Sequence, residues 1–306
     1  MNELRSIKQM RINSTMTVNQ LVNEMSGAAL GAGRLAEAVD IYEEMLRDET
    51  TKFFGLAGAM TPAGMRLVIK DMIEDGHIDV LVTTGANIVH DLIEAFGGCH
   101  YKGTSRADDV DLRHQQINRI FDVFLPEHHF TLFEEKILEI LADIDQKDLS
   151  IRELLTEMGL RVEDSILGVA AKKDVPVFCP AIADSAIGLQ AWLHTQTQKL
   201  SVDAFRDMHE FMDICYHAKK TGAIFIGGGT PKNFILQSMI VMPKSFDYAI
   251  QLTTDRPEAG GLSGATLSEA KSWGKVAENA RAVTVYGDAT ITLPIIVAAV
   301  RERIGQ

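Results

Sequence analysis

A lysine near the carboxyl-terminal end of the chain has the surroundings of an amine nucleophile. Lys275 follows Trp273 and Gly274 in SEAKSWGKVAENA, residues 268–280, which has the pattern of a helix. Lys271 lies one helical turn earlier on the same face. A neighbouring cation favours the neutral, nucleophilic form of an amine, as does removal from solvent. Trp273 offers an aromatic face to an alkylammonium ligand. The stretch predicts an imine-forming lysine; the alternative is a solvated surface lysine beside a core tryptophan.

The start of this helix can be predicted from its residue spacing. Thr266 and Glu269 have the spacing of a capping box, so the helix is expected to begin near them. Gly274 in a helix interior costs about 1 kcal/mol relative to alanine. A glycine at that position would let a ligand or a second chain approach the backbone.

Small residues end six apolar segments, and they suggest a second kind of chemistry. In open parallel sheets, ligands bind beyond the carboxyl ends of the strands, and helix N-termini there supply N–H groups for phosphate. Asp184 and Asp288 could accept hydrogen bonds from ribose hydroxyls. No Gly-x-Gly-x-x-Gly or P-loop sequence occurs, so the pattern predicts a nucleotide or dinucleotide site of unusual type. Taken singly, each segment could be a tight turn. The segments are Gly55 with Gly58, residues 83–86, 180–184 and 227–229, Thr253 with Thr254, and residues 287–289.

Other catalytic chemistries have weaker support in the sequence. The adjacent pair His128 and His129 lacks the spacing of a zinc protease motif, and no metal site is predicted. There is no Gly-x-Ser-x-Gly elbow. Cys179 follows an apolar segment and is more typical of a buried structural thiol than of a reactive one.

The elements that must position these residues alternate between strand and helix patterns. Near-continuous apolar strands are buried on both faces, which favours a mostly parallel sheet with helices on both sides, an α/β fold. No linker composition interrupts the chain, so residues 21–306 are expected to form one domain. Residues 99–130 are polar and poorly periodic, as in a long functional loop or an inserted subregion. Strands are expected at 52–60, 78–86, 174–181, 222–229, 246–254 and 281–289, and helices at 21–48, 62–76, 87–98, 187–198, 231–241 and 293–304.

Composition excludes several classes of protein. The 306 residues are 46% hydrophobic and 24% charged, as in a globular protein. A net charge of -12 disfavours a nucleic-acid partner and mildly favours cationic ones such as amines. No apolar run reaches the roughly 18 residues of a membrane helix. Three widely separated cysteines fit a reducing cytoplasm.

Several long blocks together resemble one enzyme family. The SWGK sequence is preceded by GGLSGATLSEA and followed by VYGDATITLPIIV. FFGLAGAM, IDVLVTTGANIVHDLIEAFGG, INRIFDVFLPEHHF, VPVFCPAIADSAIG, IFIGGGTPKN and DYAIQLTT precede them. In this order the blocks, spanning about residues 20–304, are similar to the deoxyhypusine synthase family.

The resemblance implies a fold and a reaction. The expected fold is a Rossmann-like α/β domain forming homotetramers with active sites across dimer interfaces. Residues 1–20 resemble an arm that could reach a neighbouring subunit, and the alternative is a mobile, disordered end. NAD is the implied cofactor. The family moves a 4-aminobutyl group from spermidine to an acceptor amine through a lysine imine. The acceptor is a lysine of a translation factor precursor (the hypusine-type factor) or, in homospermidine synthases, putrescine.

Positions that match the family's motifs identify the expected site. Lys275 matches the imine-forming lysine, Trp273 the aromatic wall along the polyamine, and Glu269 an acidic residue near a substrate ammonium. The capping role of Glu269 stays an open alternative. The positions on segments that contact NAD are Gly58, Thr84, Gly85, Asp184, Gly228, Gly229, Thr254, Asp288 and Ala289.

Departures from the family's pattern affect the substrate more than the lysine. Two acidic positions are Val89 and His90, and a third is Leu189. Asn233 stands in place of a histidine, and Leu262 in place of an acid. The positions expected to touch the substrate are therefore His90, Leu189, Asn233, Glu269 and Trp273. Losing several carboxylates should cost several kcal/mol if each charge-assisted bond contributes about 1.5–3 kcal/mol.

Three functions therefore stay open. The first is an NAD-dependent aminoalkyl transferase whose acceptor is a protein lysine or a small amine such as putrescine or agmatine. The second is a protein that binds NAD or a polyamine without catalysis. The third is an NAD-dependent amine dehydrogenase in which the lysine only relays protons.

Overall fold

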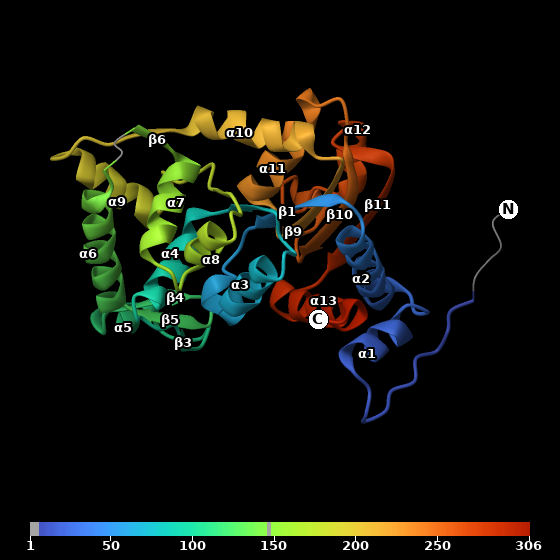
Figure 1. Ribbon diagram of the computed structural model, residues 1–306. Coiled ribbons are helices and arrows are strands. Elements are labelled where there is room, and N and C mark those ends of the chain that lie inside the picture. The colour runs from blue at the N-terminus through green and yellow to red at the C-terminus, as the bar shows by residue number, and fades with distance from the viewer. Residues whose placement is uncertain (1–5, 146–147) are drawn as a thin grey trace. The chain divides into compact units, whose positions relative to one another are not determined.

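The computed structural model describes residues 6–145 and 148–306, which divide into two compact units. Unit 1 holds the described residues up to Gly55 together with Cys215–Gln306, and unit 2 is Leu56–Ile214. The predicted α/β class is confirmed, because both units contain parallel strands and helices (Figure 1). A single domain over residues 21–306 stays a prediction.

Four neighbouring strands form the sheet of unit 1. Their order is β11-β10-β9-β1, and both β9 and β11 run parallel to β10. Most of β9 and β10 is fully buried, as near-continuous apolar strands predict. The strands are β1 (Thr50–Leu56), β9 (Lys220–Ile226), β10 (Phe246–Thr253) and β11 (Val276–Tyr286).

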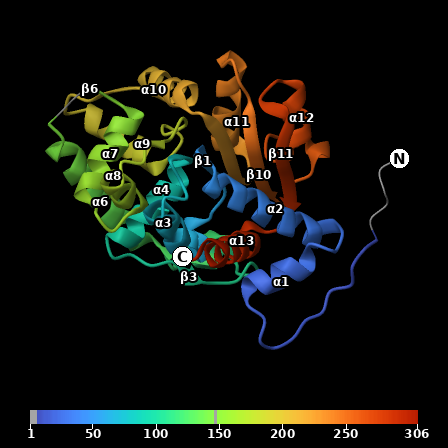
Figure 2. The ribbon, with the colours of Figure 1, turned by 45° about the vertical axis from the view of Figure 1, so that its right-hand side comes forward.

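Helices cover both sides of this sheet. Figures 1 and 2 show α2 and α13 on one side and α11 and α12 on the other. The connections β9–α11–β10 and β10–α12–β11 proceed in one direction across the sheet, so right-handed crossovers place both helices on the same face. The helices are α2 (Leu30–Arg47), α11 (Gly229–Ser238), α12 (Leu267–Ser272) and α13 (Ala289–Ile304), with short turns η2 (Met239–Val241) and η3 (Pro257–Ala259).

The amino-terminal part of unit 1 packs on its own carboxyl-terminal helix. Helix α1 (Val18–Met25) begins with a complete capping box from Thr17, whose hydroxyl also donates to Glu302 at 2.6 Å. Arg303 of α13 donates to Asn19 and Asn23 of α1. The predicted arm starts in residues 1–5, which lie outside the described residues, and residues 6–16 form no helix or strand.

Unit 2 contains a short pair of parallel strands and several helices. Strand β2 (Val80–Thr83) pairs with β7 (Val177–Phe178). Helix α4 (Gly85–Ala95) follows β2 directly and packs against η1, α6, α8 and α9. The other elements here are η1 (Thr61–Met65), α3 (Arg66–Glu74), α7 (Ile151–Arg161), α8 (Ile166–Lys172) and α9 (Ala186–Thr195).

Residues 99–130 form an inserted subregion with structure of its own. A small antiparallel sheet has the order β3-β5-β4, and α5 packs on it. A separate parallel pair, β6 with β8, lies further along the chain. The subregion contains β3 (Tyr101–Lys102), α5 (Asp109–His114), β4 (Ile117–Ile120), β5 (Val123–Pro126) and the start of α6 (Glu127–Asp143). The later elements are β6 (Asp148–Ser150), β8 (Ser201–Asp203) and α10 (Ala204–His217).

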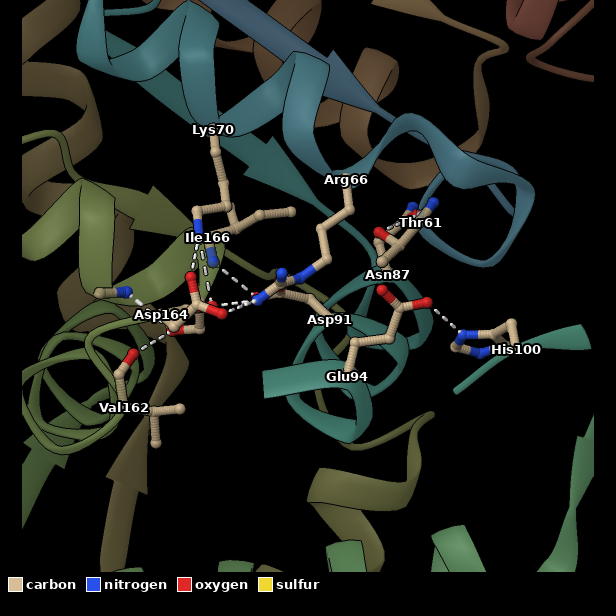
Figure 3. A network of polar contacts seen from close by, with 12 residues as sticks. Thr61, Arg66, Lys70, Asn87, Asp91, Glu94, His100, Val162, Asp164 and Ile166 are labelled. Carbon is tan, nitrogen blue, oxygen red and sulfur yellow. Dashed lines mark hydrogen bonds and ion pairs between the residues drawn. The ribbon is translucent and has the colours of Figure 1, made fainter. Parts of the chain in front are cut away.

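Buried charges hold three helices of unit 2 together. Figure 3 shows Arg66 of α3 directed at Asp91 of α4, with Nε 2.7 Å from the carboxylate. The other oxygen of Asp91 accepts the N–H of Ile166 at the start of α8, at 2.7 Å. Asp164 contacts both Arg66 and Lys70. Burial raises the pKa of Asp91 to about 6, although Arg66 and the N–H of Ile166 act in the opposite direction.

Two sequence predictions of helices were wrong in extent. The predicted helix 21–48 is broken at residues 26–29, before Leu30, which adopts a φ of 58°. Gly31 and Gly33 lie inside α2. The predicted helix across residues 268–280 ends at Ser272, and residues from Val276 onwards are strand β11.

Candidate active site

Lys275 lies between a helix and a strand. Gly274 ends α12 with a φ of 66°, a left-handed conformation that favours glycine. The N–H groups of Gly274 and Lys275 donate to the carbonyls of Lys271 and Ala270, each at 3.0 Å. The carbonyl of Lys275 accepts the N–H of Phe246 at 3.1 Å, which fixes the lysine at the start of β11.

Lys275 lies beside the aromatic ring of Trp273. Nζ of Lys275 lies 5.4 Å from the centre of the Trp273 ring, within the range of a cation–π contact. Trp273 is 65% exposed, so its ring is available to a ligand rather than part of the core. The prediction that Lys271 and Lys275 share a helix face is wrong, because the chain leaves the helix between them. Nζ of Lys271 instead donates to the carbonyl of Glu278 at 2.7 Å.

A second lysine that the sequence analysis did not assign lies close to this region. Lys232 of α11 is only 3% exposed, and its Nζ donates to Gln251 at 3.1 Å and to the carbonyls of Leu262 and Ala265. Burial lowers the pKa of Lys232 to about 8; Glu269 raises it and Lys275 lowers it further. The signal in the sequence was a lone lysine between the glycine triplet and the apolar run FIL.

Gly228 has a packing role in addition to its predicted ligand role. A Cβ on Gly228 would lie 2.3 Å from Cα of Ser263, so only glycine lets this loop approach. The loop is held by Gln251, whose amide donates to the carbonyls of Gly227 and Ser263 at 3.0 and 2.9 Å. Gly229 has a φ of 56° and begins α11.

The other dinucleotide candidates of unit 1 also follow neighbouring strands. Thr254 is exposed directly after β10. Asp288 follows β11 and caps α13, accepting the backbone N–H and the hydroxyl of Thr290 at 2.8 and 2.9 Å, and Ala289 is the first residue of that helix. Lys275 precedes β11 whereas Asp288 follows it. The regularly paired part of this strand, Arg281–Tyr286, is about 17 Å long.

Two arginines that the sequence analysis did not assign converge on Tyr286, the last residue of β11. The guanidinium carbons of Arg34 and Arg256 lie 5.4 and 4.6 Å from the centre of its ring. Together with Leu30 and Gly31 these residues line a cavity of about 290 Å³. Positive charge is therefore concentrated at the carboxyl end of β11.

The candidates of unit 2 gather around the starts of α4 and α9. Thr84 caps α4. A Cβ on Gly85 would lie 2.3 Å from that of Ser185, the cap of α9, so Gly85 lets the two helix starts approach. Asp184 is exposed beside Ser185.

Gly58 reaches the same region through a buried side chain that the sequence analysis did not assign. Gly58 has a φ of 74°, and its carbonyl accepts a bond of 2.8 Å from the amide of Asn87. The same amide contacts the hydroxyl of Thr84 at 3.2 Å. Asn87 therefore ties the turn after β1 to the start of α4.

His90 is held by a second histidine. Nδ1 of His90 lies 2.8 Å from Nε2 of His100, whose Nδ1 lies 2.7 Å from Glu94. The contact between His100 and Glu94 is drawn in Figure 3. Burial lowers the pKa of His90 to about 4, His100 lowers it further, and Glu94 acts in the opposite direction.

The remaining substituted positions have different environments. Val89 is fully buried, so it belongs to the core. Leu189 is 60% exposed on α9. Asn233 donates to Gln237 one turn later in α11 at 3.1 Å. Glu269 is exposed, and the hydroxyl of Thr266 accepts its N–H at 3.0 Å, which confirms the predicted helix start.

Cys179 fits the interpretation as a structural thiol. Cys179 is buried, and desolvation raises its pKa to about 12. No group of three or more potential metal ligands occurs within residues 6–145 and 148–306. In the same part of the chain, no helix combines the length and apolar character needed to cross a membrane.

Comparison with known proteins identifies the family. The sequence profile described as deoxyhypusine synthase matches residues 20–300. The chain belongs to the deoxyhypusine synthase family. It is 64% identical to "Probable deoxyhypusine synthase 1" of Methanosarcina acetivorans, covering 98% of this chain and 96% of that one. It is 45% identical to a protein of the same name from Archaeoglobus fulgidus, covering 96% and 97%.

A solved structure of another family member has the same fold. The chain described as a "putative deoxyhypusine synthase" from Entamoeba histolytica superposes with a TM-score of 0.67 at 19% identity, covering 96% of both chains. The predicted resemblance and the predicted class of enzyme, a transferase of the deoxyhypusine synthase type, are confirmed.

Proposed function

We propose that this deoxyhypusine synthase family member transfers a 4-aminobutyl group from spermidine or a related polyamine to an acceptor amine through an imine on Lys275, with NAD as cofactor. The observation that carries the proposal is Lys275 beside the exposed ring of Trp273, 5.4 Å away. The ring can hold an alkylammonium chain while the amine reacts with its carbon.

The residues at the strand ends fit a dinucleotide. Gly228 and Gly229 lie at the start of α11, and a helix N-terminus favours phosphate. Arg34 and Arg256 add positive charge at the end of β11. Asp288 could accept a hydrogen bond from a ribose hydroxyl. Bound NAD would take a hydride from the carbon beside the donor's secondary amine and return it at the end of the reaction.

The lysine then performs an exchange of amines. The lone pair of Nζ forms a bond to the oxidised carbon, and the bond from that carbon to the leaving nitrogen breaks. One N–H proton of the lysine passes to the leaving nitrogen, so 1,3-diaminopropane departs from spermidine as a neutral amine. The acceptor amine repeats the exchange and releases Lys275.

The position of Lys275 supports a site shared between subunits. Lys275 and the dinucleotide candidate Asp288 lie at opposite ends of β11 in one chain. A homotetramer with active sites at dimer interfaces would let Lys275 of one copy serve a dinucleotide bound by another. Residues 1–20 are proposed as an arm that contacts a neighbouring subunit, and the enzyme is proposed to be cytoplasmic.

Two acceptors fit the altered substrate positions. One is a lysine of a hypusine-type translation factor precursor, and the other is a small amine such as putrescine or agmatine. Exposed Leu189 and half-buried Asn233, at positions where the family has an acid and a histidine, favour a substrate held by fewer charges.

Borohydride trapping tests the proposal. The protein is incubated with NAD and isotopically labelled polyamines, reduced, and digested to locate the label. We expect label on Lys275, none in Lys275→Arg, and unchanged labelling in the matched control Lys271→Arg. NAD affinity should change by no more than a few-fold in either variant.

Other outcomes would select the alternatives. Retained transfer in Lys275→Arg would show that another group is the nucleophile. NAD binding without any adduct would favour a non-catalytic NAD or polyamine binder. Free NADH accumulating without an adduct would favour an amine dehydrogenase.

A further inference from the structure

Three side chains of unit 2 form a relay that ends at His90. Glu94 and His90 lie one turn apart on α4, and His100 precedes β3. His100 bridges the other two, with contacts of 2.7 Å to Glu94 and 2.8 Å to His90. The side chain of His100 is only 4% exposed, so solvent competes little for these bonds.

When His100 is neutral, the relay determines which nitrogen of each ring carries its proton. A carboxylate only accepts, so Nδ1 of His100 must donate to Glu94. In a neutral His100, Nε2 is then an acceptor, and Nδ1 of His90 must donate to it. The proton of a neutral His90 is therefore on Nδ1, and its Nε2 carries a lone pair.

That lone pair has no protein partner in the described ranges 6–145 and 148–306, where the only bond of His90 is through Nδ1. His90 is half-buried, and Phe130 packs edge-on against its ring at 6.3 Å between centres. A half-buried hydrogen-bond acceptor beside an aromatic ring can accept an N–H group of an aliphatic amine.

We propose that the Glu94–His100–His90 relay makes Nε2 of His90 a neutral hydrogen-bond acceptor for an N–H group of the amine substrate. This inference rests on the proposed function, because it assumes an amine substrate. It gives that substrate a contact that orients the amine without adding a negative charge to the site.

The neighbouring ionisable groups are consistent with a neutral His90. Burial, with a further contribution from His100, lowers the pKa of His90 to about 4. From α6, His128 and His129 add basic rings, and the pKa of His129 is lowered by burial, by His128 and by His100. Asp91 of α4 is directed at Arg66 of α3 instead.

The protonated nitrogen can be observed without any measurement of activity. In nitrogen-15 NMR spectra of the full-length protein at neutral pH, we expect Nδ1 of His90 to carry the proton and Nε2 to carry none. In His100→Phe the ring is kept but both bonds are lost, and the preference for the Nδ1-protonated form should disappear. A proton on Nε2 of His90 in the unaltered protein would overturn the proposal.

Two substitutions at His90 test whether its side chain accepts or donates the hydrogen bond to the amine. Gln can still present an oxygen, whereas Arg can only donate. We expect His90→Gln to keep KM for the amine within about threefold. We expect His90→Arg to raise KM about 10- to 100-fold, which corresponds to the free energy of one hydrogen bond to a charged group. His114→Gln on exposed α5 is the control and should leave KM unchanged, and thermal melting verifies that each variant folds.

A failure of the relay proposal can be distinguished from a failure of the proposed function. If the unaltered protein forms no adduct on Lys275 with any amine, the proposed function fails before these variants are measured. If the adduct forms but folded His90→Arg and His100→Phe bind the amine as well as the unaltered protein does, only the relay is wrong.

Discussion

Each unit buries a basic side chain, and the two have different partners. In unit 2, Arg66 bonds the carboxylate of Asp91 at 2.7 Å and also contacts Asp164. In unit 1, Lys232 bonds the amide oxygen of Gln251 and two backbone carbonyls, all of which are neutral. Arg66 is therefore paired with carboxylates, whereas Lys232 is hydrogen-bonded only to neutral groups.

The different partners indicate different roles, a structural one for the Arg66 cluster and a chemical one for the surroundings of Lys232. A carboxylate compensates a buried cation, so the Arg66 cluster joins three helices through charged hydrogen bonds. Neutral acceptors compensate less, and burial lowers the pKa of Lys232 to about 8. A lysine that can lose its proton near neutral pH, close to Lys275, is typical of a site where amines react.

The largest effect is expected from breaking the charged pair. Arg66→Met leaves Asp91 buried without its main partner, which should lower the free energy of unfolding by about 3–5 kcal/mol. Denaturant unfolding measures the change. The control Arg113→Met removes an exposed pair with Glu127 and should cost less than about 1 kcal/mol. Equal losses in the two variants would remove the basis of the comparison.

Lys232→Met should remove a pH dependence rather than a large amount of stability. The pKa of Lys232 falls from 10.5 to about 8 in the folded state. Between these values the unfolded chain binds more protons, so the free energy of unfolding rises with pH, by up to about 3 kcal/mol. Unfolding at pH values of about 7.5 and about 10 should show this rise in the unaltered protein and in Lys271→Met, but not in Lys232→Met.

The smallest effect tests the one carboxylate that acts on Lys232. Glu269 raises the pKa of Lys232. Glu269→Gln should therefore lower that pKa, and the change should be small because the carboxylate is exposed. A titration of the lysine side chains by NMR measures the shift, and Glu278→Gln should produce none. An increase in the pKa would contradict the assigned role of Glu269.

The sequence predicted most of the elements but not all of their ends. Apolar strands and glycine-rich strand ends indicated the parallel α/β arrangement, because burial on both faces leaves a pattern that can be read along the chain. The end of α12 was missed because a helical pattern continues past Gly274. The left-handed turn at that glycine brings Lys275 out of the helix and away from the face of Lys271.

Long-range contacts were beyond any pattern in the sequence. Lys232 is bonded by residues 19 to 33 positions away, and His100 reaches His90 from 10 positions away. Arg34 reaches Tyr286 from the other end of the chain. None of these pairs has a spacing that local periodicity would mark.

The sequence by itself determined the α/β class and the family, and it led to the proposal of Lys275 with Trp273 as the reactive pair, since these depend on residue types and on order along the chain. Only the tertiary structure decided which charges are paired. It placed Lys232 among neutral acceptors, Arg66 against a carboxylate, and His90 at the end of a relay. The pKa of a group depends on its burial and on charges brought near by folding, which order along the chain does not contain.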